Sequence, residues 1–82
     1  MRQVEWAIKA LKQLRKIGTS KQRKVIYDTV EDLKFFPQCK NVKKLKDRPE
    51  YRLRIGNYRV FFTVDLVILQ IEEVKKRDER TY

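Results

Sequence analysis

Two short segments joined by a Gly-Asn pair constrain the fold of this chain more than any other feature of its sequence. Residues Tyr51–Ile55 and Tyr58–Asp65 largely alternate apolar with basic or polar side chains. A period of two is typical of β-strands, whose successive side chains point to opposite faces of a sheet. Gly56-Asn57 suits a tight type II′ or I′ turn, so the two segments predict a β-hairpin.

The alternation gives this hairpin one apolar and one basic face. The apolar face comprises Tyr51, Leu53, Ile55, Tyr58, Val60 and Phe62. If that face lies against the core, the opposite face presents Arg52, Arg54, Arg59 and Phe61. Guanidinium groups beside an aromatic ring suit a phosphate backbone and its bases. An ordinary solvated sheet face remains the alternative, and for Phe61 so does a half-buried ring that supports the sheet.

The flanking sequence predicts two helices and two further strands. Residues 1–6 favour a short strand, and residues 7–18 repeat apolar side chains at helical spacing up to Gly18. Thr19 or Ser20 can cap a second helix, which Pro37 stops. Residues 66–74 are apolar on both faces, which is typical of a central strand. The predicted order β-α-α-β-β-β indicates an α+β fold for a single domain over residues 1–82: an antiparallel sheet with a two-helix hairpin on one face and an open basic face.

The connector over residues 38–50 is basic, with Leu45 as its expected core anchor. Its cations are Lys40, Lys43, Lys44, Lys46 and Arg48. These lysines fit a solvated loop as well as a contact with RNA.

The charge balance narrows the possible partners. Lys and Arg number 21 and Asp and Glu 11 among 82 residues, for a net charge of +10. Such a charge attracts polyanions, which include nucleic acid, an anionic membrane or an acidic protein. No stretch approaches the roughly 18 apolar residues of a membrane span, and the N-terminus lacks a signal-peptide pattern. We therefore expect a cytoplasmic protein with no membrane partner.

The absence of histidine excludes several kinds of active site. A His-based triad, a His general base and a Cys/His metal site are all ruled out. Cys39 is the only cysteine and cannot form an internal disulfide. No glycine-rich phosphate loop of the familiar nucleotide-binding kinds is present. We expect neither a metal nor a cofactor.

Several motifs together resemble the RelE/ParE superfamily of bacterial toxins from toxin–antitoxin pairs. They are the opening Val4-Glu5-Trp6-Ala7, the step Lys44-Leu45-Lys46, the hairpin motif Tyr51–Val60 and the closing Val74-Lys75-Lys76-Arg77-Asp78. The resemblance covers essentially the whole chain. It implies one of two activities: the RelE branch cuts messenger RNA in the ribosomal decoding site, whereas the ParE branch poisons DNA gyrase. An antitoxin protein neutralises toxins of both branches.

The resemblance to the RelE branch also implies a catalytic set, and the basic residues and Phe61 add candidate RNA contacts. The catalytic set is Arg52, Arg54, Arg59, Arg77 and Tyr82, with Tyr82 as the acid–base residue. The proposed RNA contacts are Lys43, Lys44, Lys46, Phe61 and Lys76. RNA-cutting members often have lysine where Arg52 and Arg54 stand here, and arginine is a poor proton acceptor because its pKa stays above about 12. The general base is therefore open among Tyr82, a connector lysine, a nearby glutamate and ribosomal RNA.

These features favour a metal-independent endoribonuclease that cuts messenger RNA on the 70S ribosome. A gyrase inhibitor and a non-catalytic nucleic-acid-binding module are the alternatives. The expected partners are the ribosome, messenger RNA and an acidic antitoxin, without which we expect the toxin to be monomeric. Arg77 can alternatively be a solvated charge beyond the last strand, and Tyr82 an unstructured terminal residue.

Overall fold

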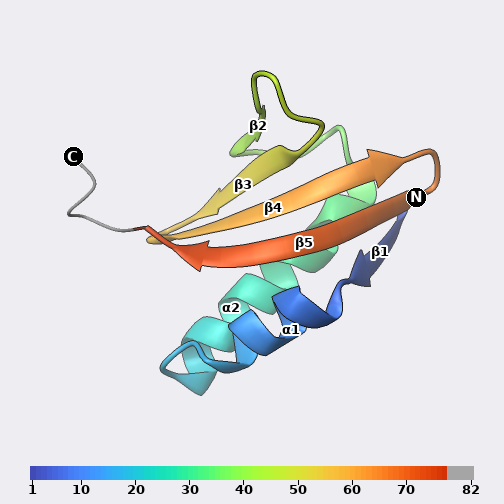
Figure 1. Ribbon diagram of the computed structural model, residues 1–82. Helices are drawn as coiled ribbons and strands as arrows, with labels where there is room; N and C mark the ends of the chain where they lie inside the picture. Colours follow the sequence, from blue (N-terminus) through green and yellow to red (C-terminus); the bar gives the residue numbers. More distant parts are fainter. Residues whose placement is uncertain (78–82) are drawn as a thin grey trace.

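The computed structural model describes residues 1–77, in which two helices cover one face of a five-stranded sheet (Figure 1). The elements are β1 (Gln3–Trp6), α1 (Ile8–Arg15), α2 (Ser20–Glu31), the 3₁₀ helix η1 (Asp32–Phe35), β2 (Val42–Lys44), β3 (Tyr51–Ile55), β4 (Tyr58–Asp65) and β5 (Ile68–Lys76). The strands lie in the order β1-β5-β4-β3-β2. The predicted α+β fold with an open sheet face is confirmed.

Two details of the sheet differ from the expectation. The sheet is mixed, because β1 pairs parallel with β5, whereas the remaining pairs are antiparallel. The basic connector also contains a strand, since Val42 pairs with Leu53 across the β2–β3 ladder. Only Val42 in this strand is apolar, so an edge strand of three residues left no alternating pattern to detect.

The helical layer begins and ends near the predicted positions. The Thr19 hydroxyl accepts a hydrogen bond from the Gln22 N–H at 3.1 Å and so caps α2, as predicted. α1 ends at Arg15, before the predicted Gly18. The chain turns earlier because Ile17 enters the core with 8% of its surface exposed, while its N–H donates to the Leu14 carbonyl at 3.1 Å.

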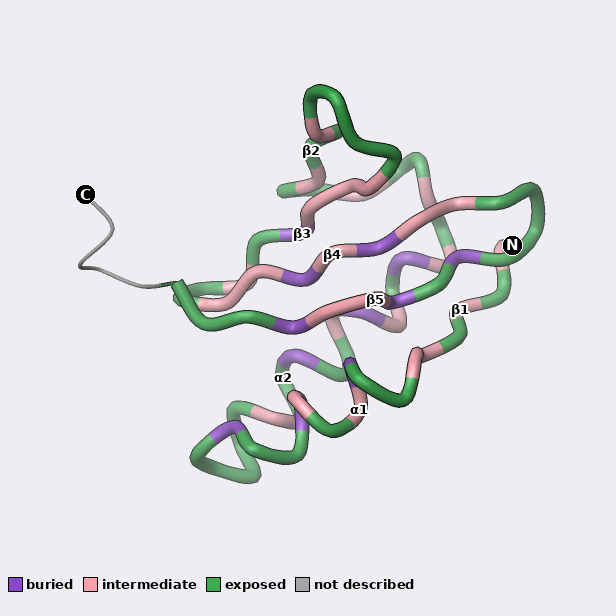
Figure 2. The backbone as a smooth tube through the Cα atoms, in the orientation of Figure 1, coloured by how far each residue is buried: buried purple, intermediate pink, exposed green. Residues whose placement is uncertain are grey.

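The core lies between the helices and the covered face of the sheet. Both layers contribute buried apolar side chains: Ala10, Leu14, Ile17, Ile26, Val30, Leu33, Leu53, Val60, Phe62, Leu69, Ile71 and Val74. Burying one Val, Leu, Ile or Phe side chain contributes about 1.5–3 kcal/mol. In Figure 2 buried positions recur along β4 and β5 between half-buried and exposed ones. The expected anchor Leu45 is half-buried and stands outside this cluster.

The hairpin has the predicted bounds. Gly56 adopts a positive φ of 55°, whereas Asn57 does not, which fits the type II′ alternative. β5 begins at Ile68, later than the predicted residue 66, because Leu66 takes the left-handed φ of 53° in the turn after β4. β5 lies between β1 and β4, so its prediction as a central strand is confirmed.

A β-bulge in β5 decides which of its side chains reach the open face. Phe62 pairs with Ile71 but Phe61 pairs with Glu73, so Glu72 is an extra residue. The bulge brings Val74 opposite the buried Val60. Without it, strict alternation from Ile71 would turn Glu73 towards the core and Val74 towards solvent.

Candidate functional site

Two neighbouring rows of side chains cross the open face of the sheet. The first, here called the arginine row, places Arg54 opposite Arg59 and Arg59 opposite Lys75. The second, here called the phenylalanine row, runs across four strands through Lys43, Arg52, Phe61 and Glu73. The predicted grouping of Arg52, Arg54, Arg59 and Phe61 on one face is therefore present in the structure.

Cross-strand neighbours place these cations within range of one another's fields. Directly opposed residues have Cβ atoms about 4.5–5.5 Å apart, and charges are screened over about 8 Å at physiological ionic strength. Arg54 is exposed, whereas Arg52 and Arg59 are half-buried and the Arg59 Nε atom is fully covered. Partial burial weakens screening by water, so the rows form a fixed positive surface suited to a phosphate group.

Arg77 lies at the end of the sheet that carries the arginine row. Its backbone N–H donates a hydrogen bond to the Asn57 carbonyl at 2.6 Å, beside the β3–β4 turn. β5 therefore ends next to that turn (Figure 1). Tyr82, the expected acid–base residue, lies outside the described residues.

The proposed RNA-contacting residues are divided by the sheet. Lys43 and Phe61 belong to the phenylalanine row on the open face. Lys44 instead lies over the Tyr51 ring, 5.4 Å from its centre, and donates to the Arg48 carbonyl at 2.7 Å.

The other two proposed contacts lie outside both rows. Lys46 follows β2 in the turn that leads to β3. Lys76 pairs with Tyr58, whose ring packs against the core, and so belongs to the covered side. Of the proposed lysine contacts, only Lys43 shares the open face with the arginines.

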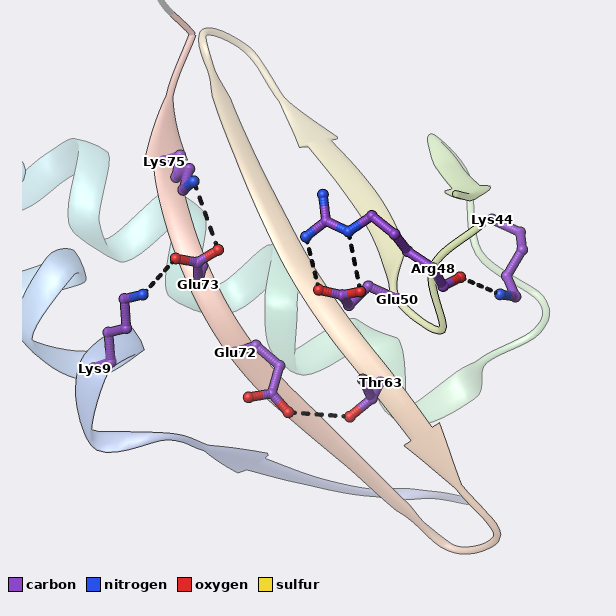
Figure 3. Close-up of polar contacts among 8 residues, drawn as sticks. All are labelled: Lys9, Lys44, Arg48, Glu50, Thr63, Glu72, Glu73 and Lys75. Atoms are coloured by element: carbon purple, nitrogen blue, oxygen red, sulfur yellow. Dashed lines mark hydrogen bonds and ion pairs between the residues drawn. The ribbon is translucent and has the colours of Figure 1, made fainter. Parts of the chain in front are cut away.

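Lys75 and Glu73 stand on the open face although sequence reasoning did not single them out. Glu73 pairs with the Lys9 ammonium at 2.7 Å and the Lys75 ammonium at 3.7 Å (Figure 3). The hydrogen bond from Lys9 holds the pKa of the Glu73 carboxyl below its ordinary value of 4.5; the attraction of Lys75 adds to this effect and burial opposes it. The break in alternation after Ile71 was the available signal for their position.

Acidic groups occupy the part of the open face farther from the β3–β4 turn. The Thr63 hydroxyl donates to the Glu72 carboxylate at 3.2 Å, and Arg48 pairs with Glu50 at 2.9 Å. In Figure 3 Thr63, Glu72 and Glu73 lie on the side of the sheet away from the helices. The carboxylates of Glu50 and Glu72 therefore lie outside the two rows.

The other side chains with reactive groups do not form a metal site or a reactive cysteine within the described residues. Within residues 1–77, no three His, Cys, Asp or Glu side chains gather in a way that could hold a metal ion. Burial, reinforced by Asp32, raises the pKa of the half-buried Cys39 thiol, which disfavours the nucleophilic thiolate. No helix in that part of the chain is long and apolar enough to cross a membrane. The open face remains as the place where charge and an aromatic surface converge.

Solved structures with the same fold include an isolated toxin and chains of toxin–antitoxin complexes. The chain matches one in the RelBE2 toxin–antitoxin complex of Mycobacterium tuberculosis with a TM-score of 0.81 and 21% identity, covering 93% of this chain and 98% of that one. The isolated RelE toxin of E. coli matches with a TM-score of 0.78 and 20% identity, over 96% and 87% of the two chains. A chain of the RelE–RelB complex from Pyrococcus horikoshii matches with a TM-score of 0.80 and 22% identity, over 95% and 97%.

Sequence comparison identifies the family itself. No curated protein matches the chain. The family described as "ParE toxin of type II toxin-antitoxin system, parDE" matches residues 4–80, nearly the whole sequence. The chain therefore belongs to the ParE toxin family, within the RelE/ParE superfamily of type II toxin–antitoxin toxins.

Proposed function

We propose that this toxin cuts messenger RNA bound in the decoding site of the ribosome. The observation that carries the proposal is the convergence of Arg52, Arg54 and Arg59 with Phe61 in two adjacent rows of the open face. An extended, uncovered surface suits a polymer better than a small substrate. Action on ribosomes would place the protein in the cytoplasm.

The arrangement suits the charge requirement of phosphodiester cleavage. When the 2′-hydroxyl attacks the adjacent phosphorus it loses its proton and forms a 2′,3′-cyclic phosphate, while the bond to the 5′-oxygen of the next nucleotide breaks and that oxygen leaves as a protonated hydroxyl. The transition state of this exchange carries increased negative charge on the phosphoryl oxygens. Fixed cations aimed at that charge lower the barrier, and arginine can bind two oxygens at once. In the proposal Arg54 and Arg59 contact the reacting phosphate, Arg77 approaches it from the end of β5, and Arg52 holds the neighbouring backbone.

Phe61 would contribute a surface on which a base can stack. Its ring lies in the phenylalanine row between Arg52 and Glu73. Stacking of a base on an aromatic side chain contributes about 1–3 kcal/mol and tolerates any base. This contact would orient the messenger while the arginines bind its backbone.

Proton transfer is assigned to groups other than the arginines. Tyr82 takes this role in the proposal because of the family resemblance. Glu73 is suited instead to neutralising lysines, because Lys9 and Lys75 already engage its carboxylate. With little acid–base assistance of its own, the toxin would depend on the ribosome to align the 2′-hydroxyl.

An acidic antitoxin is the proposed natural inhibitor. The net charge of +10 favours a partner of opposite sign, and several of the matching structures are toxin–antitoxin complexes. Covering the open face would block access to RNA. We propose that the toxin is monomeric before the antitoxin binds.

Inhibition of DNA gyrase is the second candidate, and the family match specifically favours it. The matching family is named for ParE toxins rather than for RelE toxins. A protein inhibitor that acts by binding does not need cations arranged around a scissile phosphate. The basic rows therefore favour RNA cleavage over gyrase inhibition.

Pulse labelling in cells that express the toxin would separate the candidates. Methionine incorporation should fall within minutes of induction, before DNA breaks accumulate, and Arg59→Ala should restore it. Early DNA breaks with translation intact would instead support gyrase inhibition. Normal translation and intact DNA, despite abundant folded protein, would leave only the non-catalytic binding module.

A further inference from the structure

Lys75 extends the arginine row although it lies outside the set implied by the resemblance. The bulge at Glu72 turns Lys75 to the open face, directly opposite Arg59. Its side chain is 57% exposed, so the ammonium is accessible from solvent. Lys75 therefore offers a solvent-accessible cation at the β5 end of a row that otherwise consists of arginines.

Glu73 is the carboxylate paired with that ammonium. The Glu73 side chain is only 19% exposed and is itself anchored by the 2.7 Å contact with Lys9 of α1. The Glu73 carboxylate holds the Lys75 ammonium at 3.7 Å, where that ammonium is 5.9 Å from the centre of the Phe61 ring. Lys9, Glu73 and Lys75 thus form a chain of contacts from the helical layer to the face of the Phe61 ring.

We propose that Lys75 is a further RNA-contacting residue, which binds the phosphate next to a base stacked on Phe61, and that Glu73 is its positioning residue. This inference rests on the proposed function. Stacking places a base over Phe61, and the phosphate joined to that nucleotide lies at the edge of the ring. A base stacked on Phe61 takes the place of the Lys75 ammonium over the ring. The exposed lysine side chain then meets the phosphate joined to that nucleotide, without displacing the neighbouring arginines.

The same chain offers matched controls for this role. Lys76 is the next residue and carries the same charge, but its register with Tyr58 places it on the covered side. Lys21, exposed on α2, gives a second control in the helical layer. Each of the three alanine variants loses one positive charge. Any difference in RNA affinity among them therefore depends on where the lost lysine lies.

Binding of a single-stranded RNA with 2′-O-methyl sugars tests the contact without cleavage. Lys75→Ala should lower the slope of log affinity against log salt by about 0.7, with roughly fivefold weaker binding at moderate salt, whereas Lys75→Arg should keep most of the affinity. Lys76→Ala and Lys21→Ala should each cause a smaller loss. Equal losses in all three alanine variants would overturn the contact.

A double-mutant cycle tests the positioning role of Glu73. Glu73→Gln removes the contact with Lys75 but also removes a negative charge, so its own effect on affinity is ambiguous. Lys75→Ala should weaken binding less in the Glu73→Gln background than in the wild type. The same loss in both backgrounds would overturn the positioning role.

Arg59→Ala separates failure of this inference from failure of the proposed function. Weaker RNA binding by Arg59→Ala, together with unchanged binding by Lys75→Ala, contradicts only the inference about Lys75. Unchanged binding by Arg59→Ala, Arg54→Ala and Lys75→Ala would contradict the use of the open face for RNA.

Discussion

Phe61 and Phe62, neighbours on β4, lie on opposite faces of the sheet and have different surroundings. Phe62 is fully buried on the covered face and packs against Tyr51 and Phe36, with ring centres 5.5 and 5.9 Å away. Phe61 is half-buried on the open face, between an arginine and a glutamate on the adjacent strands. The covered face holds the apolar core, whereas the open face carries the cations of the two rows.

The comparison also explains why a bulge occurs in β5. Val74 is needed opposite Val60 in the core, and the inserted Glu72 makes that pairing possible. The same shift brings Lys75 beside Arg59. Packing of the covered face therefore sets which charges reach the open face.

The largest expected difference between the two faces is in the free energy of unfolding of the alanine variants of Phe62 and Phe61. Phe62→Ala should lower the free energy of unfolding by about 3–5 kcal/mol, because it removes buried surface and leaves a cavity. Phe61→Ala should lower it much less. Denaturant unfolding measures both values, and equal losses would show that Phe61 also belongs to the core.

The hairpin shows how much of this contrast could be predicted from sequence. Alternation and the Gly-Asn turn gave the bounds of β3 and β4 and the shared face of Arg52, Arg54 and Arg59, because these depend on local geometry. β2 and the parallel pairing of β1 could not be predicted in the same way. They depend on long-range pairing with β3 and β5.

The division of the expected RNA contacts between the two faces of the sheet has equally specific causes. The sequence does not show that Lys75 rather than Lys76 reaches the open face, because the register of β5 depends on the bulge, which only pairing with β4 defines. Lys44 was grouped with Lys43, although consecutive strand residues point to opposite faces once β2 is recognised. The resemblance supplied Arg77 and Tyr82, which no periodic pattern would have indicated.

Loss of an arginine on the open face should affect activity rather than stability. Arg59→Ala should raise the barrier to cleavage by about 2–4 kcal/mol, as expected for a preorganised charge that meets a transition state. Arg77→Ala should act in the same direction, and Arg15→Ala on α1 is the matched control. Cell growth after induction measures toxicity, and thermal unfolding measures stability. Full toxicity of a normally folded Arg59→Ala protein would contradict the role of Arg59 in cleavage.

Protonation of Glu73 should have the smallest effect on the free energy of unfolding. The direction of that effect follows from the lowered pKa of the Glu73 carboxyl. The pKa in the folded state lies below the ordinary 4.5, so the ionised form stabilises the fold. That stabilisation is complete above the unfolded-state pKa and disappears as the pH falls through the lower folded-state value. The partner lysines are mostly exposed, so the contribution should stay below about 1 kcal/mol.

Unfolding of wild type and Glu73→Gln across acidic pH measures this contribution. The difference in unfolding free energy between the two proteins should be constant near neutrality and should shrink as the pH drops below 4.5. A difference that grows on acidification would mean that the carboxyl is stabilised in its protonated form.

The most direct test of the account is cleavage mapping on ribosomes programmed with a defined messenger RNA. Purified wild-type toxin should produce new 5′ ends in the decoding site, little cleavage of the same RNA without ribosomes, and none of these ends when Arg59 is replaced by alanine. An intact ribosome-bound messenger, with the same preparation trapping cleaved DNA on gyrase, would contradict the central claim that the basic open face is an RNA-cleaving surface.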